Sequence, residues 1–274
     1  MDKTKEKNTS VWKNASVSFL KIFGVIVCAY IFVLTVVFSL FPGATANYFK
    51  FFGATKAEEL CYERQYQKTN DIADLYNLIL FEQDRNNLKQ LQFINELRSK
   101  KEYEDFCKKL NDSALSDTTE KSLVAYVGDV NAYLVNQKVK CLYKLNLGCE
   151  VFIYTELKSG KLTEQSFASY AELVYTDKSL TKEQKIAKYH DLIDTAELDG
   201  QTLEVLLNNR LLALNEKVSE ENLQENEEII LKFTLAKDYK ACYYVYSTLG
   251  NEVKTSEFMT KYNEAIAEYN NIIK

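Results

Sequence analysis

An uncharged apolar segment near the N-terminus constrains this chain more than any other feature. It runs from Ile22 to Phe41, reads IFGVIVCAYIFVLTVVFSLF, and contains no charged residue and no proline. An α-helix rises about 1.5 Å per residue, so about 20 residues cross a hydrocarbon layer of about 30 Å. We therefore expect residues 22–41 to form a transmembrane helix in contact with the lipid bilayer.

The charges beside this segment predict its direction, because cytoplasmic flanks of membrane helices are enriched in lysine and arginine. Five lysines precede the segment: Lys3, Lys5, Lys7, Lys13 and Lys21. On the other side, Lys50 and Lys56 are soon followed by acidic residues. The pattern predicts a single-pass protein of the cell membrane, with a cytoplasmic basic tail (1–21), a signal anchor (22–41) and an extracytoplasmic domain (42–274).

Two other interpretations of the segment remain open. It has the features of a cleaved signal peptide, because Ala44, Thr45 and Ala46 are placed like a cleavage site, and the protein is then secreted after cleavage near Ala46. Cleavable apolar regions usually have about 7 to 15 residues, so the length favours an uncleaved anchor. A buried core helix is disfavoured, because a long helix that is apolar on all sides is suited to lipid.

Aromatic residues lie on both flanks of the segment. Trp12 precedes it, and a group of four follows it: Tyr48, Phe49, Phe51 and Phe52. Aromatic side chains collect at both surfaces of a bilayer, so these residues fit an interfacial belt. The later group fits the start of a folded core equally well.

The composition favours helices and argues against a nucleic-acid partner. The formal net charge is −5, and the lysine-rich tail makes the remainder more acidic still. An acidic surface repels phosphate backbones, so we expect no binding to nucleic acid. With eight glycines and a single proline, Pro42, the chain lacks the turn residues of a sheet-rich fold.

Helical periodicity runs through nearly all of residues 42–274. Apolar residues recur three and four positions apart, as in Phe167, Tyr170 and Val174, which places them on one helical face. Roughly ten helices of about 10 to 25 residues are expected. Short polar breaks separate them: Gly53, Gln83–Asn86, Ser99–Lys101, Asn111–Asp117, Ser159–Gly160, Asp177–Leu180, Asp199–Gly200 and Gly250–Asn251. Two pairs have the spacing of a capping box, which marks helix starts: Asp117 with Glu120, and Thr181 with Gln184.

A pattern of aromatic and small residues opens this region. Tyr48–Phe52 is followed by the turn residue Gly53 and then by a face rich in alanine and tyrosine, formed by Ala57, Leu60, Tyr62, Glu63 and Tyr66. This pattern resembles the second half of a tetratricopeptide repeat. Asn70–Leu78 is similar to the start of the next repeat, with Leu75 in the usual tryptophan place, and Gln83-Asp84 lies where that family turns again. The resemblance covers residues 46 to about 99, with one residue fewer than usual before Ala57.

Beyond Lys100 the chain has no clean period of about 34 residues, the length of a tetratricopeptide repeat. We therefore predict an all-α fold in which an N-terminal transmembrane helix is followed by an antiparallel helical array. A solenoid like that of tetratricopeptide repeats is expected, and an irregular helical bundle is the alternative.

Residues with catalytic chemistry are few. The single histidine, His190, has Asp194 one helical turn further on, but no nucleophile is near, and an exposed helical histidine explains it better. Five glutamates fit a solvated helix start better than a metal site: Glu220, Glu221, Glu225, Glu227 and Glu228. No glycine-rich phosphate loop or zinc-ligand spacing is present. We expect no catalytic residue, no metal and no cofactor.

Besides Cys28 in the apolar segment, five cysteines follow it: Cys61, Cys107, Cys141, Cys149 and Cys242. Outside the cell they are able to form two disulfides and leave one thiol, but the sequence does not indicate their pairing. Each has apolar neighbours on a predicted helix, which favours buried free thiols. Free thiols also suit an inverted topology, in which the helical domain faces a reducing cytoplasm.

Tyrosine is abundant, with 19 residues. Tyr239, Tyr243 and Tyr246 share one helical face, and Tyr62 and Tyr66 form a similar pair. Such stripes usually belong to a core, but tyrosine is also favoured at protein interfaces. Because of this preference for interfaces, Tyr239, Tyr243 and Tyr246 are the candidate partner-binding face. The frequent tyrosine, lysine, asparagine and isoleucine are typical of an AT-rich bacterial genome.

Two classes of function fit these observations. The first is a membrane-tethered helical-repeat interaction or scaffold module, which binds a protein or an envelope component outside the cell. The alternative is an exported all-helical hydrolase that uses paired carboxylates. A cleft with two desolvated carboxylates distinguishes the second class from the first. We expect the first class, with a protein as partner.

Overall fold

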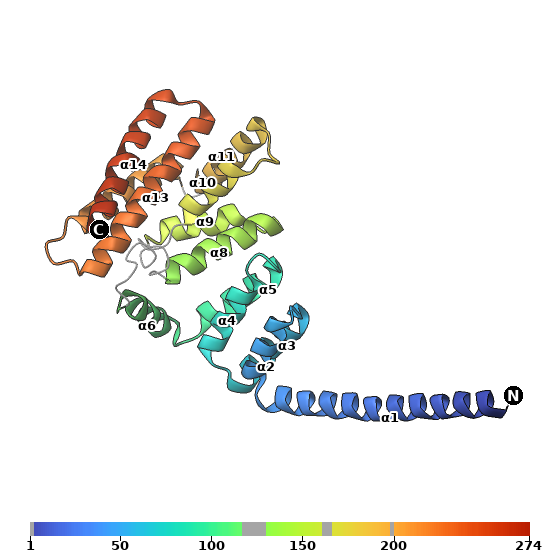
Figure 1. Ribbon diagram of the computed structural model, residues 1–274. Helices are drawn as coiled ribbons and strands as arrows, with labels where there is room; N and C mark the ends of the chain where they lie inside the picture. The colour runs from blue at the N-terminus through green and yellow to red at the C-terminus, as the bar shows by residue number, and fades with distance from the viewer. Residues whose placement is uncertain (1–2, 117–129, 161–165, 198–199) are drawn as a thin grey trace. The chain divides into compact units, whose positions relative to one another are not determined.

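The computed structural model describes residues 3–116, 130–160, 166–197 and 200–274. Within these ranges the regular structure consists of thirteen α-helices, and none of the residues lies in a strand (Figure 1). The predicted all-α fold is therefore confirmed. The chain forms two compact units, Met1–Phe81 and Glu82–Lys274, named here the N-terminal unit and the C-terminal unit.

The helices of the N-terminal unit are α1 (Lys3–Leu40), α2 (Pro42–Phe51), α3 (Thr55–Thr69) and α4 (Ile72–Glu82), of which only the last residue, Glu82, belongs to the C-terminal unit. Pro42 opens α2, where its missing N–H leaves no hydrogen bond unmade. Gly53, between α2 and α3, has a φ of +66°, a conformation that glycine adopts without the steric clash of a Cβ atom. The chain therefore turns where proline and glycine permit it.

Helix α1 contains the candidate membrane segment. Val17–Leu40 has 24 residues, is strongly apolar and is not buried in the protein. Because α1 begins at Lys3, the helix continues through most of the basic tail. By length and composition Val17–Leu40 fits a membrane anchor, and it fits a signal sequence equally.

Each of the three shorter helices of this unit contributes fully buried side chains. Ala46 of α2 and Cys61 of α3 have no exposed surface. On α4, Leu75, Leu78 and Ile79 are also fully buried, as their spacing along one face predicts.

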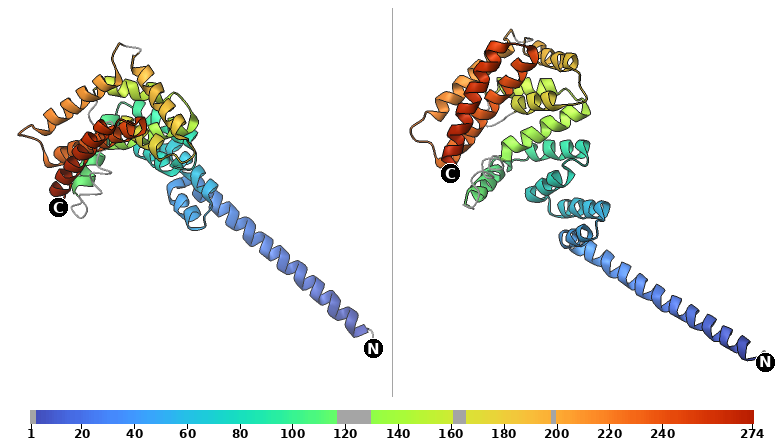
Figure 2. Two further views of the ribbon diagram at one scale, coloured as in Figure 1. Left: turned by 90° about the horizontal axis from the view of Figure 1, so that it is seen from above. Right: turned by 45° about the horizontal axis from the view of Figure 1, so that its top comes forward.

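The C-terminal unit contains nine helices with described bounds: α5 (Asn87–Ser99), α6 (Tyr103–Ser116), α8 (Val130–Leu145), α9 (Cys149–Lys158), α10 (Ser166–Thr176), α11 (Lys182–Glu197), α12 (Leu203–Val218), α13 (Glu225–Leu249) and α14 (Glu252–Ile272). Some helices pack against the helix two places further along the chain: α8 contacts α10, and α9 contacts α11. Helix α10 also packs on α13, and α13 runs beside α14 (Figure 2).

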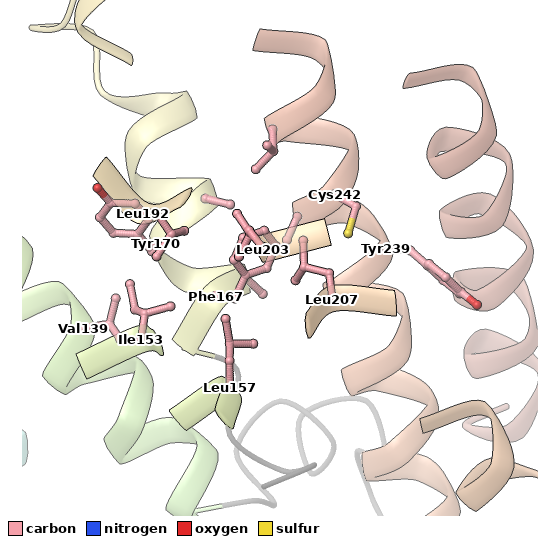
Figure 3. Close-up of a cluster of buried hydrophobic side chains, with 14 of the residues drawn as sticks. Val139, Ile153, Leu157, Phe167, Tyr170, Leu192, Leu203, Leu207, Tyr239 and Cys242 are labelled. Carbon is pink, nitrogen blue, oxygen red and sulfur yellow. The ribbon is translucent and has the colours of Figure 1, made fainter. Parts of the chain in front are cut away.

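A large cluster of buried side chains surrounds α10 (Figure 3). Phe167 and Tyr170 of α10 are almost fully buried together with Ile153 of α9 and Leu192 of α11. The Tyr170 hydroxyl donates a hydrogen bond to Glu150 Oε1 at 2.6 Å, so its polar end is satisfied inside the protein. This cluster holds α8 to α13 in fixed positions within the unit.

Most of the predicted breaks coincide with observed helix ends. The segment Asn111–Asp117 is an exception, because α6 continues to Ser116 and Asp117 lies outside the described residues. A break between Leu145 and Cys149 was not predicted, although Asn146 and Gly148 there both have positive φ. Polar residues alone therefore do not end a helix, whereas residues that tolerate the left-handed conformation do.

One of the two predicted capping boxes is present. Thr181 N donates to Gln184 Oε1 at 2.8 Å, and Gln184 N donates to Thr181 Oγ1 at 3.3 Å. These reciprocal bonds satisfy two free donors at the start of α11. The other predicted pair, Asp117 with Glu120, lies outside the described residues.

Candidate functional site

A groove of about 440 Å³ lies between α8, α10 and α13 of the C-terminal unit, beside the turn that follows α4. Three side-chain amides and three hydroxyl groups line it, with two lysines and one glutamate: Gln83, Asn136, Gln137, Tyr133, Ser169, Thr176, Lys140, Lys237 and Glu172. Ala168, Leu173 and Phe233 add apolar surface. This combination gives many hydrogen-bonding groups beside a few apolar contacts.

Helical spacing explains why these side chains meet. On α8, Tyr133, Asn136 or Gln137, and Lys140 recur three and four positions apart and therefore share one face. On α10, Ser169 and Thr176 are seven residues apart, which is about two turns. Since α10 packs against both α8 and α13, the polar faces of neighbouring helices together form the groove.

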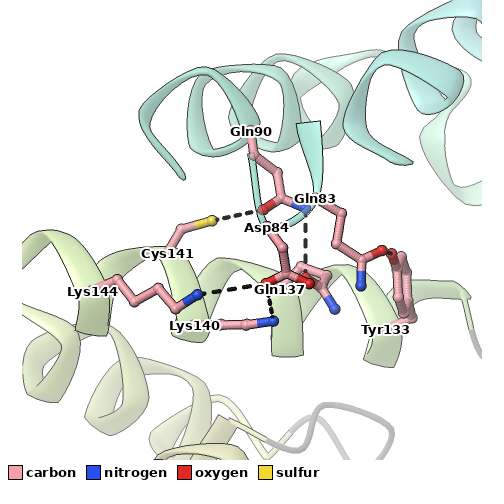
Figure 4. Close-up of polar contacts among 8 residues, drawn as sticks. All are labelled: Gln83, Asp84, Gln90, Tyr133, Gln137, Lys140, Cys141 and Lys144. Atoms are coloured by element: carbon pink, nitrogen blue, oxygen red, sulfur yellow. Dashed lines mark hydrogen bonds and ion pairs between the residues drawn. The ribbon is translucent and has the colours of Figure 1, made fainter. Parts of the chain in front are cut away.

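The turn after α4 is tied to α8 by polar contacts (Figure 4). The Tyr133 hydroxyl donates to Gln83 Oε1 at 2.9 Å, and Lys140 Nζ lies 2.6 Å from Asp84 Oδ1. Lys144 Nζ lies 3.5 Å from the same oxygen. The hydrogen bond from Lys140 lowers the pKa of Asp84 below its ordinary value, so this carboxylate remains charged.

A second set of contacts, centred on Gln90, lies beside these residues (Figure 4). Gln90 of α5 is 1% exposed, and both the nitrogen and the oxygen of its side-chain amide form hydrogen bonds. Gln90 Nε2 donates to Gln137 Oε1 at 3.5 Å, and the Cys141 thiol donates to Gln90 Oε1 at 3.2 Å. A buried amide needs such partners, so Gln90 holds Gln137 in its place at the groove.

The other wall of the groove is connected through α10. Ser169 donates a hydrogen bond to Asn136 Oδ1, which joins α10 to α8. Lys237 Nζ lies 3.9 Å from Glu172 Oε2 and 5.7 Å from the centre of the Phe233 ring. Glu172 is the one carboxylate among the described residues that line the groove. The groove therefore lacks the pair of carboxylates that hydrolysis of a glycosidic bond uses.

The chemistry of the groove suits a polypeptide. A side-chain amide offers both donors and an acceptor, and each peptide group along a chain presents one donor and one acceptor. The hydroxyls of Tyr133, Ser169 and Thr176 also serve in both roles. Positive and negative side chains lie near one another in the groove, as Lys237 and Glu172 do. The groove therefore carries no large net charge of either sign.

A buried ion pair lies outside the groove, between α12 and α13. Arg210 Nε lies 2.6 Å from Asp238 Oδ2, and both side chains are about 5% exposed or less. Burial raises the pKa of Asp238, although the neighbouring Arg210 acts in the opposite direction. Asp238 Oδ1 accepts no hydrogen bond within the described part of the chain. The pair joins two helices and is not open to a ligand.

The predicted aromatic face is divided between two places, because Tyr239 and Tyr246 both lie near Phe258 of α14, whereas Tyr243 lies near α10. Tyr239 is buried, and its hydroxyl accepts a hydrogen bond from Asn215 Nδ2 at 3.0 Å. Tyr246 stacks on Phe258 of α14, with ring centres 5.5 Å apart. Tyr243 is half-buried near Tyr175 of α10, at 6.5 Å. Much of this stripe therefore lies between helices, and a partner-binding role for it stays a prediction.

His190 and Asp194 are exposed on α11. In the described ranges, no group of three or more histidine, cysteine, aspartate or glutamate side chains is arranged to hold a metal ion. Glu225, Glu227 and Glu228 lie in the first turn of α13, where the helix dipole favours negative charge. The glutamate cluster is thus placed at a helix start, with ion pairs from Lys217 to Glu220 and Glu227.

The five cysteines that follow α1 are buried free thiols: Cys61, Cys107, Cys141, Cys149 and Cys242. Burial raises the pKa of Cys61 and Cys141 to about 11 and that of Cys149 to about 12. The thiolate is the reactive form, so these thiols are unreactive at neutral pH.

Sequence reasoning did not identify the groove residues, because polar side chains at helical spacing look the same on a solvated face. Asn136, Gln137 and Ser169 become distinctive only when α8 and α10 pack together. A usable signal was the amide pair Asn136-Gln137 one turn from both Tyr133 and Lys140. Comparisons of the chain with protein-family models, curated proteins and solved structures gave no match.

Proposed function

We propose that the protein is a membrane-tethered interaction module whose groove between α8, α10 and α13 binds an extended segment of a partner protein outside the cell. The groove is the observation that carries the proposal. It offers amides, hydroxyls and apolar surface along three helices, which together match a peptide backbone and its side chains. The single groove carboxylate, Glu172, favours binding over hydrolysis.

The tether is α1. Its apolar segment Val17–Leu40 is long enough to cross a bilayer, and the lysines of the tail favour a cytoplasmic N-terminus. The small residues that resemble a cleavage site lie inside α2, where Thr45 and Ala46 are buried. Cleavage after Ala46 removes part of α2 from the fold, which supports retention of α1.

The helical array supports a repeat-like scaffold. The alternate contacts of α8 with α10 and of α9 with α11 are those of stacked helical hairpins. In the N-terminal unit, Gly53 turns the chain between α2 and α3, and α4 follows after a second short turn, so short helices alternate with short turns there too. A stacked array displays one continuous face to a partner, which suits a scaffold.

Site-specific photo-crosslinking in intact cells tests this function. A photoreactive phenylalanine analogue replaces Thr176, which is exposed at the groove and whose hydroxyl donates a hydrogen bond to the backbone oxygen of Glu172. Thr260 on α14 is the matched control, because it is also exposed and bonds to the backbone oxygen of Ser256. We expect covalent adducts with one protein partner at position 176 and none at position 260.

A second variant tests whether the groove is responsible for the crosslinked adduct at position 176. Asn136→Ala removes a groove amide without emptying a buried site, so helicity is expected to remain while the adduct at position 176 decreases. Equal adduct yields at positions 176 and 260, or an adduct unaffected by Asn136→Ala, contradict the proposed function.

A further inference from the structure

Two glutamines of the groove use their side-chain oxygen atoms inside the protein. Gln83 Oε1 accepts a hydrogen bond from the Tyr133 hydroxyl, and Gln137 Oε1 accepts one from Gln90 Nε2 (Figure 4). Within the described ranges, the NH₂ groups of Gln83 and Gln137 donate no hydrogen bond. Both amides therefore line the groove with unused N–H donors.

The third amide of the groove has the same arrangement. Asn136 Oδ1 accepts a hydrogen bond from the Ser169 hydroxyl, and its NH₂ group donates to no other described residue. The protein thus supplies a donor to each of the three amide oxygens. What the amides leave for a ligand is chiefly N–H groups, which bind oxygen acceptors.

Lys237 adds a cationic donor to these amides. Its Nζ atom lies 3.9 Å from Glu172 Oε2, which is too long for a hydrogen bond, and it donates none within the part of the chain that the structure describes. The other lysine of the groove, Lys140, is already bound to Asp84 at 2.6 Å. Lys237 is therefore the lysine that is available to a ligand, and an ammonium group binds a carboxylate more strongly than a neutral acceptor.

The hydroxyl groups of the groove have the opposite role. Ser169 donates its proton to Asn136, and Thr176 donates its proton to the backbone oxygen of Glu172. The hydroxyl oxygens remain able to accept hydrogen bonds from the backbone N–H groups of a peptide. The amides and Lys237 are then left for the acceptor groups of its side chains.

We infer that the segment held in the groove is acidic, with aspartate or glutamate carboxylates bound by Lys237 and by the NH₂ groups of Gln83, Asn136 and Gln137. This inference rests on the proposed function, because it names the chemistry of the peptide that the groove binds. Glutamine or asparagine side chains in the same place lack the negative charge that Lys237 favours.

Binding of two fluorescent peptides by the full-length protein in micelles of a neutral detergent tests the inference. In the first peptide glutamate alternates with alanine, and in the second glutamine replaces every glutamate. Alternate side chains of an extended chain point to the same side, so each peptide presents one row of carboxylates or of amides. We expect fluorescence anisotropy to show about tenfold tighter binding of the glutamate peptide.

Variants of the groove show where the peptide binds, because the lysine-rich tail also attracts carboxylates. Asn136→Asp keeps the oxygen that accepts from Ser169 but replaces the NH₂ group by a charged oxygen. Asn209→Asp makes the same change at an exposed position of α12. Lys237→Gln removes the cation, and Lys254→Gln is its control, because Lys254 also lies near a glutamate and a phenylalanine ring.

We expect Asn136→Asp and Lys237→Gln to keep the helicity of the wild type and to bind the glutamate peptide about tenfold more weakly, whereas both controls bind it as the wild type does. Unchanged binding by the two groove variants overturns the inference, because the peptide is then held elsewhere.

Equal affinity for the two peptides overturns the acidic specificity alone, and the groove stands as a peptide site if Asn136→Ala still lowers the adduct at position 176. If neither peptide binds, the acidic specificity is wrong as well. The crosslinking at position 176 then decides the proposed function by itself.

Discussion

Leu78 and Leu80 lie two positions apart on α4 and meet opposite environments. Leu78 is fully buried, whereas Leu80 is 41% exposed. Helical geometry separates the two side chains by about 200°, so one faces the protein and the other faces solvent. Truncation of each leucine to alanine therefore has a different cost, although the chemical change is the same.

We expect Leu78→Ala to reduce the free energy of unfolding by roughly 2 to 5 kcal/mol, because it removes buried methyl groups and leaves a cavity. Leu80→Ala is the matched control and is expected to cost much less, because its side chain is already partly in water. Urea unfolding of the detergent-solubilised protein, followed by circular dichroism, measures both values. Equal losses for the two variants contradict the assigned faces of α4.

The ion pair between Arg210 and Asp238 gives a second prediction for individual residues. Asp238→Ala leaves the Arg210 charge buried without its carboxylate, so we expect a loss of about 3 to 5 kcal/mol in unfolding free energy. Glu268→Ala is the control, because Glu268 pairs with Lys232 at 3.1 Å but is largely exposed. Such a surface pair contributes about 0 to 1 kcal/mol. Urea unfolding that shows a similar loss for both variants contradicts the burial of the pair.

The ends of helices were easier to predict from the sequence than the polar segments through which a helix continues. The break at Gly250 was predicted because glycine takes the left-handed conformation that ends α13, where φ is +79°. The predicted break at Asn111–Asp117 was wrong as far as Ser116, because polar residues such as Asn111 and Asp112 are also compatible with a helix. The observed turn at Asn146 and Gly148 carried the same signal as the correct breaks and was overlooked.

The turn between α10 and α11 provides a pH-dependent prediction. Asp177 accepts hydrogen bonds from both the backbone N–H and the hydroxyl of Ser179 and from the Tyr143 hydroxyl, and these bonds lower its pKa below the ordinary 3.8. A lowered folded-state pKa stabilises the protein above the unfolded pKa, and this contribution is lost as the pH falls through the folded pKa. We expect Asp177→Asn to be less stable than the wild type at neutral pH.

Because the variant cannot ionise at this position, the difference in stability from the wild type is expected to shrink in acid. Urea midpoints at neutral pH and at about pH 3 give this difference. A difference that is the same at both pH values contradicts the role of the Asp177 carboxylate in joining the turn to α8.

At the scale of the whole molecule, the all-α fold and the apolar N-terminal helix followed from composition and periodicity. The groove could not be predicted in this way, because its residues come from segments as far apart in the sequence as Gln83 and Lys237. Hydrophobic periodicity marks the buried face of each helix but does not show which polar faces meet. The division of Tyr239, Tyr243 and Tyr246 between two packing sites has the same origin, since it depends on where α10 and α14 lie.

We propose that α1 holds the helical array outside the cell while the lysine-rich tail stays inside. The buried thiols allow a direct test, because the native cysteines after α1 are protected from maleimide by the fold. In a Cys28→Ser background, Leu212→Cys adds a thiol at a position that is 61% exposed, and Ser10→Cys adds one in the tail.

Labelling of intact cells with a membrane-impermeant maleimide is the decisive measurement. We predict that Leu212→Cys is labelled in intact cells, whereas Ser10→Cys is labelled only after the membrane is permeabilised. Labelling of Ser10→Cys in intact cells, together with protection of Leu212→Cys, contradicts the proposed topology, because it places the helical array in the cytoplasm.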